Sequence, residues 1–431
     1  MSSMSSINAS RDHHEVGLAE HEPLPAAESG KDNRVIGATI TAVDVERVEQ
    51  SLWGAFADIQ LSAPCSSPLS KYPKFGASLG SWSWPQAVVL VRITADTGHS
   101  GIGWAEDGVA AASNIIQRHF KRFLLGADPG RIEMLWDQMF RASIPYGRKG
   151  AAIEALSAVD LALWDLAGKI AQTPVNRLLG GPVREQIPAY ASHLQPVDMN
   201  LFIEEARSYV AQGYRAMKMR MPGNPSHGAA GIRANVERVK AVRDAVGPDI
   251  DIMVDAYMGW DLAFALRMTT QLEPYGLRWV EEPLLPDEIG AYAELRRRSP
   301  IPIATGEHEF TRYGFQQLIE NGCADVLQLD VHRVGGITEA RRVCALASAA
   351  GLEVVPHAFS SPTVHLVSAH ANCPLVEHLT IPIWAQDMQT SEPLWLGEPS
   401  VENGNVILND GPGFGVSVNP KVLPRLAHWK D

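Results

Sequence analysis

The fold is decided by three short apolar stretches, IDIMVDAYMGW (250–260), LRWVEEPLL (277–285) and IPIATGEHEF (301–310). Each has the composition of a β-strand, and each ends in a carboxylate where the hydrophobic pattern breaks, at Asp255, Glu281 and Glu307. The spacing is regular, because 281 − 255 and 307 − 281 both equal 26. About 26 residues accommodate one strand, one helix and two connecting loops. The stretch therefore predicts the repeat of a parallel α/β barrel.

The three acids also predict a metal site. Side chains at the carboxyl ends of neighbouring barrel strands converge on one mouth of the barrel. A single acid at one of these positions would have an ordinary structural explanation, as a helix cap or an ion-pair partner. Three carboxylates that converge stay ionised only if a cation lies among them, and hard oxygen ligands suit Mg2+. We therefore expect Asp255, Glu281 and Glu307 to bind Mg2+.

The same pattern continues on both sides of this stretch. VLQLDVH (326–332), LEVVPHAFS (352–360) and PLVEHL (374–379) read as strands that end at Asp330, His357 and Glu377. Upstream, YRAMKMR (214–220) places Lys218 and Arg220 two positions apart, on one face of a strand. Imidazole titrates near neutrality and a carboxylate can tune it, so His357 is the expected base and Asp330 its partner. A guanidinium stays protonated, so Arg220 can bind an anion but is a poor base.

With these motifs the chain resembles the mandelate racemase-like group of the enolase superfamily, from about residue 35 to its C-terminus. The resemblance also rests on AVDLALWDLAGK (158–169), GEH (306–308) and PGFGV (412–416). Within the group the pattern is most similar to the L-rhamnonate dehydratases, through SPLSKY (67–72), KMRMP (218–222), GAAGI (228–232) and His308. That group places a His and an Arg near the first long loop, whereas residues 51–86 contain neither.

The resemblance implies a modified TIM barrel, (β/α)7β, with an α+β capping domain over its mouth. It implies a Mg2+-dependent dehydratase of acid sugars, either aldonates or aldarates. In such an enzyme His357 takes the proton next to the carboxylate, an enediolate forms, and loss of the 3-hydroxyl gives a 2-keto-3-deoxy acid. By the same resemblance Lys218 is catalytic, a protonated Glu377 donates a hydrogen bond to the substrate carboxylate, and Arg220 and His308 contact the substrate. A homo-oligomer is also implied.

Changes in composition predict the domain boundaries. Residues 1–34 have no apolar periodicity and read as a disordered tail, 35–148 as the capping domain, 149–389 as the barrel, and 390–431 as a segment that returns to the cap. Residues 51–86 form a long aromatic loop of the kind that serves as a lid. Its Tyr72 and Trp82 are either packing residues or substrate contacts.

Composition sets the outer limits on function. The chain has 431 residues, of which 45% are hydrophobic and 20% charged, and this is typical of a globular protein. The net charge of −12 argues against binding nucleic acid or an anionic membrane, so a small carboxylate substrate would have to be attracted by local charge. Four scattered cysteines and the absence of a leader or membrane-span pattern lead us to expect reduced thiols and a cytoplasmic enzyme.

Two other functions remain open at this stage. A racemase or epimerase of a 2-hydroxy acid would need a base on each face of the substrate. A barrel that binds or supports without turnover would need no intact set of acid, base and metal ligands, so the sequence favours it least.

Overall fold

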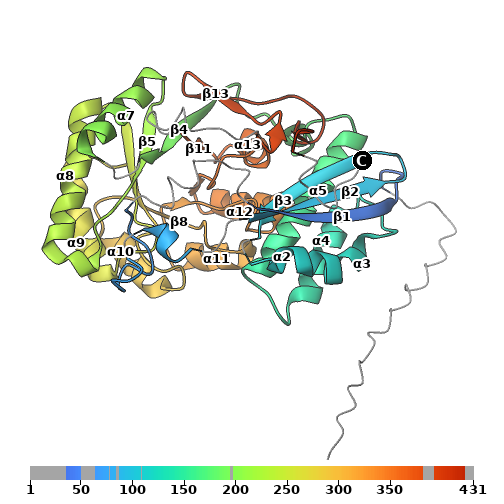
Figure 1. The fold of residues 1–431 in the computed structure, drawn as a ribbon, viewed down its shortest axis with the longest axis horizontal. Helices are drawn as coiled ribbons and strands as arrows, with labels where there is room; N and C mark the ends of the chain where they lie inside the picture. The colour runs from blue at the N-terminus through green and yellow to red at the C-terminus, as the bar shows by residue number, and fades with distance from the viewer. Residues whose placement is uncertain are drawn as a thin grey trace, which may run out of the picture. The chain divides into compact units, whose positions relative to one another are not determined.

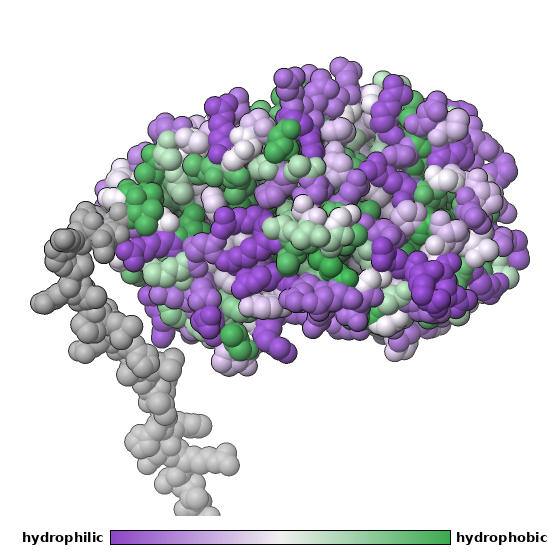
Figure 2. All heavy atoms as spheres, turned by 180° about the vertical axis from the view of Figure 1, so that it is seen from behind, coloured by the Kyte–Doolittle hydropathy of each residue, from purple (hydrophilic) through white to green (hydrophobic). Residues whose placement is uncertain are grey.

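The computed structural model describes residues 35–49, 64–76, 78–83, 87–107, 109–194, 198–381 and 393–422, and Arg34–Asp431 form one compact unit (Figure 1). The predicted tail and part of the predicted lid lie outside the described residues. Seen from behind, polar side chains cover much of the surface, and apolar groups lie between them (Figure 2). Among the described helices, none is both long enough and apolar enough to cross a membrane.

The N-terminal region has an antiparallel sheet followed by helices, as expected of an α+β capping domain. Strand β1 (Ile40–Glu49) pairs with β2 (Ala87–Ala95), which pairs with β3 (Ser100–Glu106). The helical segments that follow are α2 (Ala111–Ile115), the π-helical turn η3 (Ile116–Phe120), α3 (Lys121–Leu124), α4 (Ile132–Ser143), α5 (Ala151–Ile170) and α6 (Val175–Leu178). Helix α5 lies directly on β3, because a Cβ at Gly103 would be 2.1 Å from the Ala158 carbonyl oxygen.

Eight parallel strands then form the barrel. They are β4 (Ile187–Leu194), β5 (Ala216–Arg220), β6 (Asp251–Asp255), β7 (Trp279–Glu281), β8 (Ile303–Thr305), β9 (Val326–Leu327), β10 (Glu353–Val354) and β11 (Val376–Leu379). One helix follows each of the first seven: α7 (Met199–Ala211), α8 (Gly228–Val246), α9 (Leu262–Leu272), α10 (Ile289–Arg298), α11 (Thr311–Glu320), α12 (Gly336–Ala349) and α13 (Ser361–Ala369). Neighbours in sequence pair in order from β4 to β10, and β11 pairs with β4. The expected (β/α)7β barrel is therefore confirmed.

The barrel interior shows why the polar residues meet at one level. A buried apolar layer takes one residue from each strand or its flank: Tyr190, Ala216, Met253, Trp279, Ala304, Val326, Val355 and Leu375. Side chains of a strand alternate between its two faces, so the next inward positions lie two residues further on. They are Ser192, Lys218, Asp255, Glu281, Gly306, Gln328, His357 and Glu377. The polar layer therefore lies next to this apolar floor, on the side of the carboxyl ends of the strands.

The C-terminal segment contacts both parts of the molecule. Strand β14 (Asn405–Ile407) pairs with β13 (Ser400–Glu402) and antiparallel with β4 of the barrel, whereas β12 (Trp395–Leu396) pairs with β15 (Ser417–Val418). The Trp395 ring lies 4.3 Å from that of Trp104 in β3. The Phe414 N–H donates to Asp165 of α5 over 2.9 Å. The predicted return to the cap occurs, and a strand added to the barrel accompanies it.

Candidate active site

A cavity of about 300 Å3 opens at the carboxyl ends of the barrel strands, and the cap forms part of its wall. The cap contributes side chains from β2, β3 and the first turn of α5, among them Val88, Trp104, Glu106 and Glu154. The predicted site residues that line the cavity are Lys218, Arg220, Glu307, His308, Asp330, His357 and Glu377. Regularly spaced strand ends thus bring together residues that lie between Lys218 and Glu377 in the sequence.

Four predicted site residues are not part of this wall. Asp255 and Glu281 are buried partners on the adjacent strands β6 and β7, in the polar layer. Tyr72 is 51% exposed, and neither it nor Trp82 borders the cavity, so their contact with substrate stays a prediction.

Lys218 joins two of the buried acids. Its ammonium group bonds to Glu281 and lies 2.9 Å from a carboxylate oxygen of Glu377. Burial alone would lower the pKa of Lys218, but Glu281 and Glu377 outweigh burial and raise it well above its usual value. Lys218 is therefore held as an ammonium ion, able to stabilise negative charge and unsuited to take a proton.

Glu377 differs from the expectation. Burial favours its neutral form, but the charges of Lys218 and His357 outweigh burial and lower the pKa of Glu377. Its carboxylate also accepts a hydrogen bond from the Ala358 N–H over 2.8 Å. These contacts favour the carboxylate over the expected protonated donor, and the sequence did not reveal that a lysine pairs with this acid.

His357 and Asp330 form the expected pair. Nδ1 of His357 lies 2.7 Å from Oδ2 of Asp330, and Nε2 lies 3.6 Å from Glu307. Burial lowers the pKa of His357, but Glu307, Asp330 and Glu377 together raise it to about 10. The His332 backbone N–H donates to the other Asp330 oxygen over 2.7 Å and fixes the carboxylate. With Nδ1 bound to Asp330, Nε2 is the nitrogen that remains for acid–base chemistry, with Glu307 3.6 Å away.

Arg220 lies beside the predicted metal ligands. Its Nη1 is 3.5 Å from Oδ2 of Asp255, and its guanidinium stacks over the Tyr257 ring at 5.0 Å. Nε and Nη1 are buried and make no hydrogen bond with the described residues. A buried guanidinium with unused N–H groups in a cavity wall suits an oxygen-rich anion.

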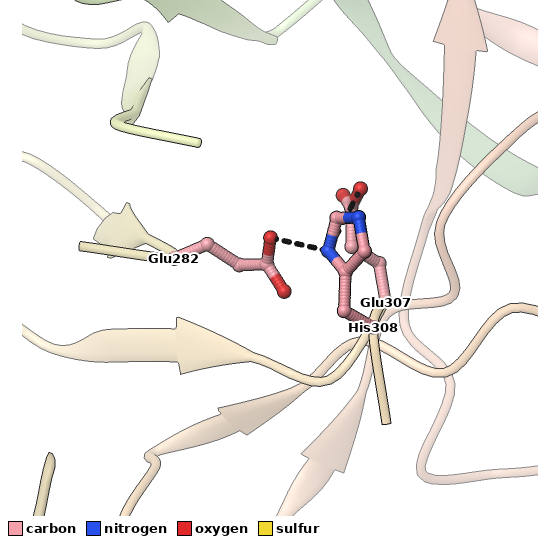
Figure 3. A group of neighbouring side chains, drawn as sticks. All are labelled: Glu282, Glu307 and His308. Atoms are coloured by element: carbon pink, nitrogen blue, oxygen red, sulfur yellow. Dashed lines mark hydrogen bonds and ion pairs between the residues drawn. The ribbon is translucent and has the colours of Figure 1, made fainter. Parts of the chain in front are cut away.

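A second acid near Glu307 was missed. Glu282, Glu307 and His308 each offer one ligand atom, and these atoms lie within 4.8 Å of one another (Figure 3). Nδ1 of His308 is 2.8 Å from Glu282 and 3.5 Å from Glu307. Glu307 reaches this group because the chain turns after β8 at Gly306, whose φ is +135°. The sequence WVEEP does contain Glu282 as a second acid, and this could have indicated its role. Strand alternation, however, pointed to Glu281 alone.

The donor set fits a divalent cation. Burial raises the pKa of Glu281 to about 7, and Asp255, Glu377 and Glu307 add to the rise while Lys218 opposes it. Burial and the neighbouring carboxylates both disfavour the charged form of Glu281, and a cation among these acids would offset both effects. Two of the three ligands grouped at Glu307 are carboxylates, which suits a hard ion such as Mg2+.

The cap side of the cavity holds a further polar group that the sequence did not predict. Arg333 donates to Glu106 of β3 over 2.9 Å and to the Glu307 carbonyl over 3.3 Å. His332 contacts the Trp104 carbonyl through Nδ1 and Ser360 through Nε2, both over 2.9 Å. Arg333 lies three residues after Asp330, but strand spacing does not reveal which cap residues it meets.

Comparisons with known families agree with this architecture. The family described as "Mandelate racemase / muconate lactonizing enzyme, N-terminal domain" matches residues 72–180, and "Enolase C-terminal domain-like" matches residues 201–422. The chain is 41% identical over 370 residues to an L-rhamnonate dehydratase from Saccharopolyspora erythraea, covering 85% of this chain and 92% of the relative.

Solved structures give the same result. The L-rhamnonate dehydratase from Gibberella zeae in complex with Mg is similar with a TM-score of 0.82 and 34% identity, over 90% of this chain and 96% of that one. A racemase from Streptomyces coelicolor A3(2) with bound magnesium is similar with a TM-score of 0.75 and 30% identity, over 90% and 99% of the two chains. The chain is therefore an enzyme that belongs to the enolase superfamily, in its mandelate racemase and muconate lactonizing enzyme group.

Proposed function

We propose that this enzyme is a Mg2+-dependent acid-sugar dehydratase, which converts an aldonate or aldarate to a 2-keto-3-deoxy acid. The observation that carries the proposal is the His–Asp pair of the cavity, His357 with Asp330, set against an arginine at position 220. The dehydratase names of relatives that are 40% and 41% identical support the same reaction type.

Asp255, Glu281 and Glu307 would hold the metal, with Glu282 and His308 beside Glu307. Mg2+, when bound, supplies positive charge that stabilises the enediolate formed from the substrate carboxylate. Lys218 and Arg220 add fixed positive charge to the same wall of the cavity. Preorganised positive charge of this kind lowers the free-energy barrier to forming the dianionic enediolate.

Neutral His357 takes the proton from carbon 2 at Nε2, and the electron pair of the C–H bond passes into the enediolate. The imidazolium then gives that proton to the 3-hydroxyl while the C3–O bond breaks, so water leaves and an enol remains. The enol tautomerises to the keto acid. Asp330 stabilises the imidazolium, and Glu377 orients Lys218 and the Ala358 backbone beside His357.

A racemase or epimerase is the alternative, and it requires a second base. Arg220 is unsuited because it stays protonated, and Lys218 is held as an ammonium ion between Glu281 and Glu377. His308 is the remaining candidate for a second base, although its Nδ1 is bound to Glu282.

The test is a panel of mono- and diacid sugars scored for 2-keto acid formation, with and without EDTA. We expect turnover only with Mg2+, and Asp255→Asn, Glu281→Gln and Glu307→Gln should each abolish it. His357→Asn should stop both turnover and exchange of the C2 hydrogen with D2O. Full activity in EDTA contradicts the metal assignment, and continued exchange in His357→Asn would identify another base and favour epimerisation.

A further inference from the structure

One acid of the cavity has no part in the chemistry described above. Glu154 lies in the first turn of α5, faces the cavity and is only partly accessible to solvent. Its carboxyl group makes no hydrogen bond or ion pair with any residue that the structure describes. The neighbouring acid Glu106 differs, because it binds Arg333.

Its surroundings place Glu154 on the cap side of the cavity. The charges that act on it most come from Glu106, Arg333, Asp330 and Asp107. Arg333 does not neutralise it by contact, since the guanidinium already donates to Glu106 and to Glu307. Burial and then Glu106 raise the pKa of Glu154 to about 7, so the group both donates and accepts hydrogen bonds near neutrality.

A structural role accounts for only part of this arrangement. An acid in the first turn of a helix interacts favourably with the helix dipole, which explains a Glu near the start of α5. It does not explain why an unpaired carboxyl group borders the reaction cavity. The bound substrate must place its carboxylate and carbon 2 near His357, and its remaining carbons have to extend toward another part of the wall.

We propose that Glu154 is a substrate-binding residue that recognises a hydroxyl group of the acid sugar beyond carbon 3. This inference rests on the proposed dehydratase function and deepens it. A carboxyl group that accepts and donates hydrogen bonds suits a distal hydroxyl, and its ionised form repels a second carboxylate at the same place. Glu154 therefore makes the enzyme prefer the monoacid to the diacid of the same sugar.

The experiment compares substrates that differ only at the distal end. Glu154→Ala should lower kcat/KM about tenfold for a six-carbon aldonate, chiefly through KM, and leave the three-carbon 2,3-dihydroxy acid unchanged because it has no distal hydroxyl. Glu154→Gln keeps the shape and should raise the ratio of kcat/KM for the matched aldarate over the aldonate about tenfold. Glu133→Gln is the control, since Glu133 is a first-turn acid of α4 that binds Arg341 and Arg342 outside the cavity.

The outcomes separate the two proposals. A wild-type enzyme that forms no keto acid from any acid sugar overturns the dehydratase proposal and this inference with it. Normal wild-type turnover with Glu154 variants that act equally on long and short substrates overturns the role of Glu154 alone. Thermal unfolding of each variant identifies a purely structural effect, which would lower stability and change both substrates alike.

Discussion

At the scale of single residues, the Asp330–His357 hydrogen bond can be tested through the pH dependence of activity. Asp330 helps to raise the pKa of His357 to about 10, although burial opposes it. Asp330→Asn removes that charge, so the pKa of His357 falls. Because the neutral imidazole takes the proton, the rising limb of kcat/KM against pH should move to lower pH. We also expect kcat to fall on the order of 10²-fold, because the imidazolium is less stabilised.

Asp325→Asn is the matched control, since it breaks the pair of a barrel acid with Arg296 outside the cavity. Its pH profile should match that of the wild type. An unchanged pH profile in Asp330→Asn would show that Asp330 does not tune His357.

The structure also shows which site residues could be predicted from the sequence. Lys218, Asp255 and Glu281 follow from strand alternation, because each lies two residues beyond an apolar residue of the barrel floor. Glu282 and Arg333 did not follow, because they lie in loops after the strands, where alternation no longer holds. The charge state of Glu377 depended on its contact with Lys218, which no spacing predicts.

A second residue-scale prediction concerns Asp165, a buried acid of α5. Its carboxylate accepts from the Ile102 N–H over 2.8 Å, the Phe414 N–H over 2.9 Å and the Lys169 ammonium over 2.6 Å. Asp165→Ala would leave two buried N–H groups unpaired, at about 1–3 kcal/mol each, so we expect a loss of about 2–6 kcal/mol in the free energy of unfolding. Denaturant titration measures this loss.

Asp137→Ala provides the comparison. Asp137 pairs with Arg141 at the same four-residue spacing as Asp165 with Lys169, but on the surface. Solvent screens such exposed pairs, so Asp137→Ala should change the free energy of unfolding much less than Asp165→Ala does. Equal effects of the two substitutions would refute the structural role of Asp165.

At the scale of elements, the close approach of β3 and α5 depends on glycine. A Cβ at Gly103 would lie 2.1 Å from the Ala158 carbonyl oxygen and 2.5 Å from the Ala162 nitrogen, and neither backbone atom can move without moving the helix. Gly103→Ala should therefore cost on the order of 3 kcal/mol. Since α5 carries Glu154 and β3 carries Glu106, it should also raise KM. Gly290→Ala in α10 meets no atom within 4 Å and should stabilise the protein by about 0.5–1 kcal/mol.

Elements were easier to predict than their packing. The alternation of strands and helices from Ile187 to Leu379 followed from the regular spacing of apolar runs. Within the helical pattern that precedes β4, α5 ends at Ile170 and a short second helix, α6, follows before Gly180. The attachment of β14 to β4 was not foreseen, because short strands near a C-terminus carry no signal for their partners.

At the scale of the whole molecule, a shared hydrophobic cluster joins the cap to the barrel, beside a second cluster that lies within the cap. A single buried cluster contains Val88 and Trp104 of the cap together with Val254 and Leu327 of the barrel. Hydrogen bonds join the two parts as well: Trp136 donates to the Gly335 carbonyl over 2.8 Å, and the Gly335 N–H donates to Ser157 over 2.9 Å. Neither part can lose its structure without exposing apolar surface of the other, so the two should unfold together.

The prediction for the whole molecule joins this shared core to the metal site. Calorimetry should show one unfolding transition for cap and barrel, and Mg2+ at 100 times its Kd should stabilise that transition by about 2.7 kcal/mol relative to EDTA. Asp255→Asn should abolish the shift, because it removes one of the carboxylates whose repulsion the cation relieves, and Asp325→Asn should retain it. Two separate transitions, of which Mg2+ moves only one, would show that the cap folds independently and that its wall of the cavity is not fixed by the barrel.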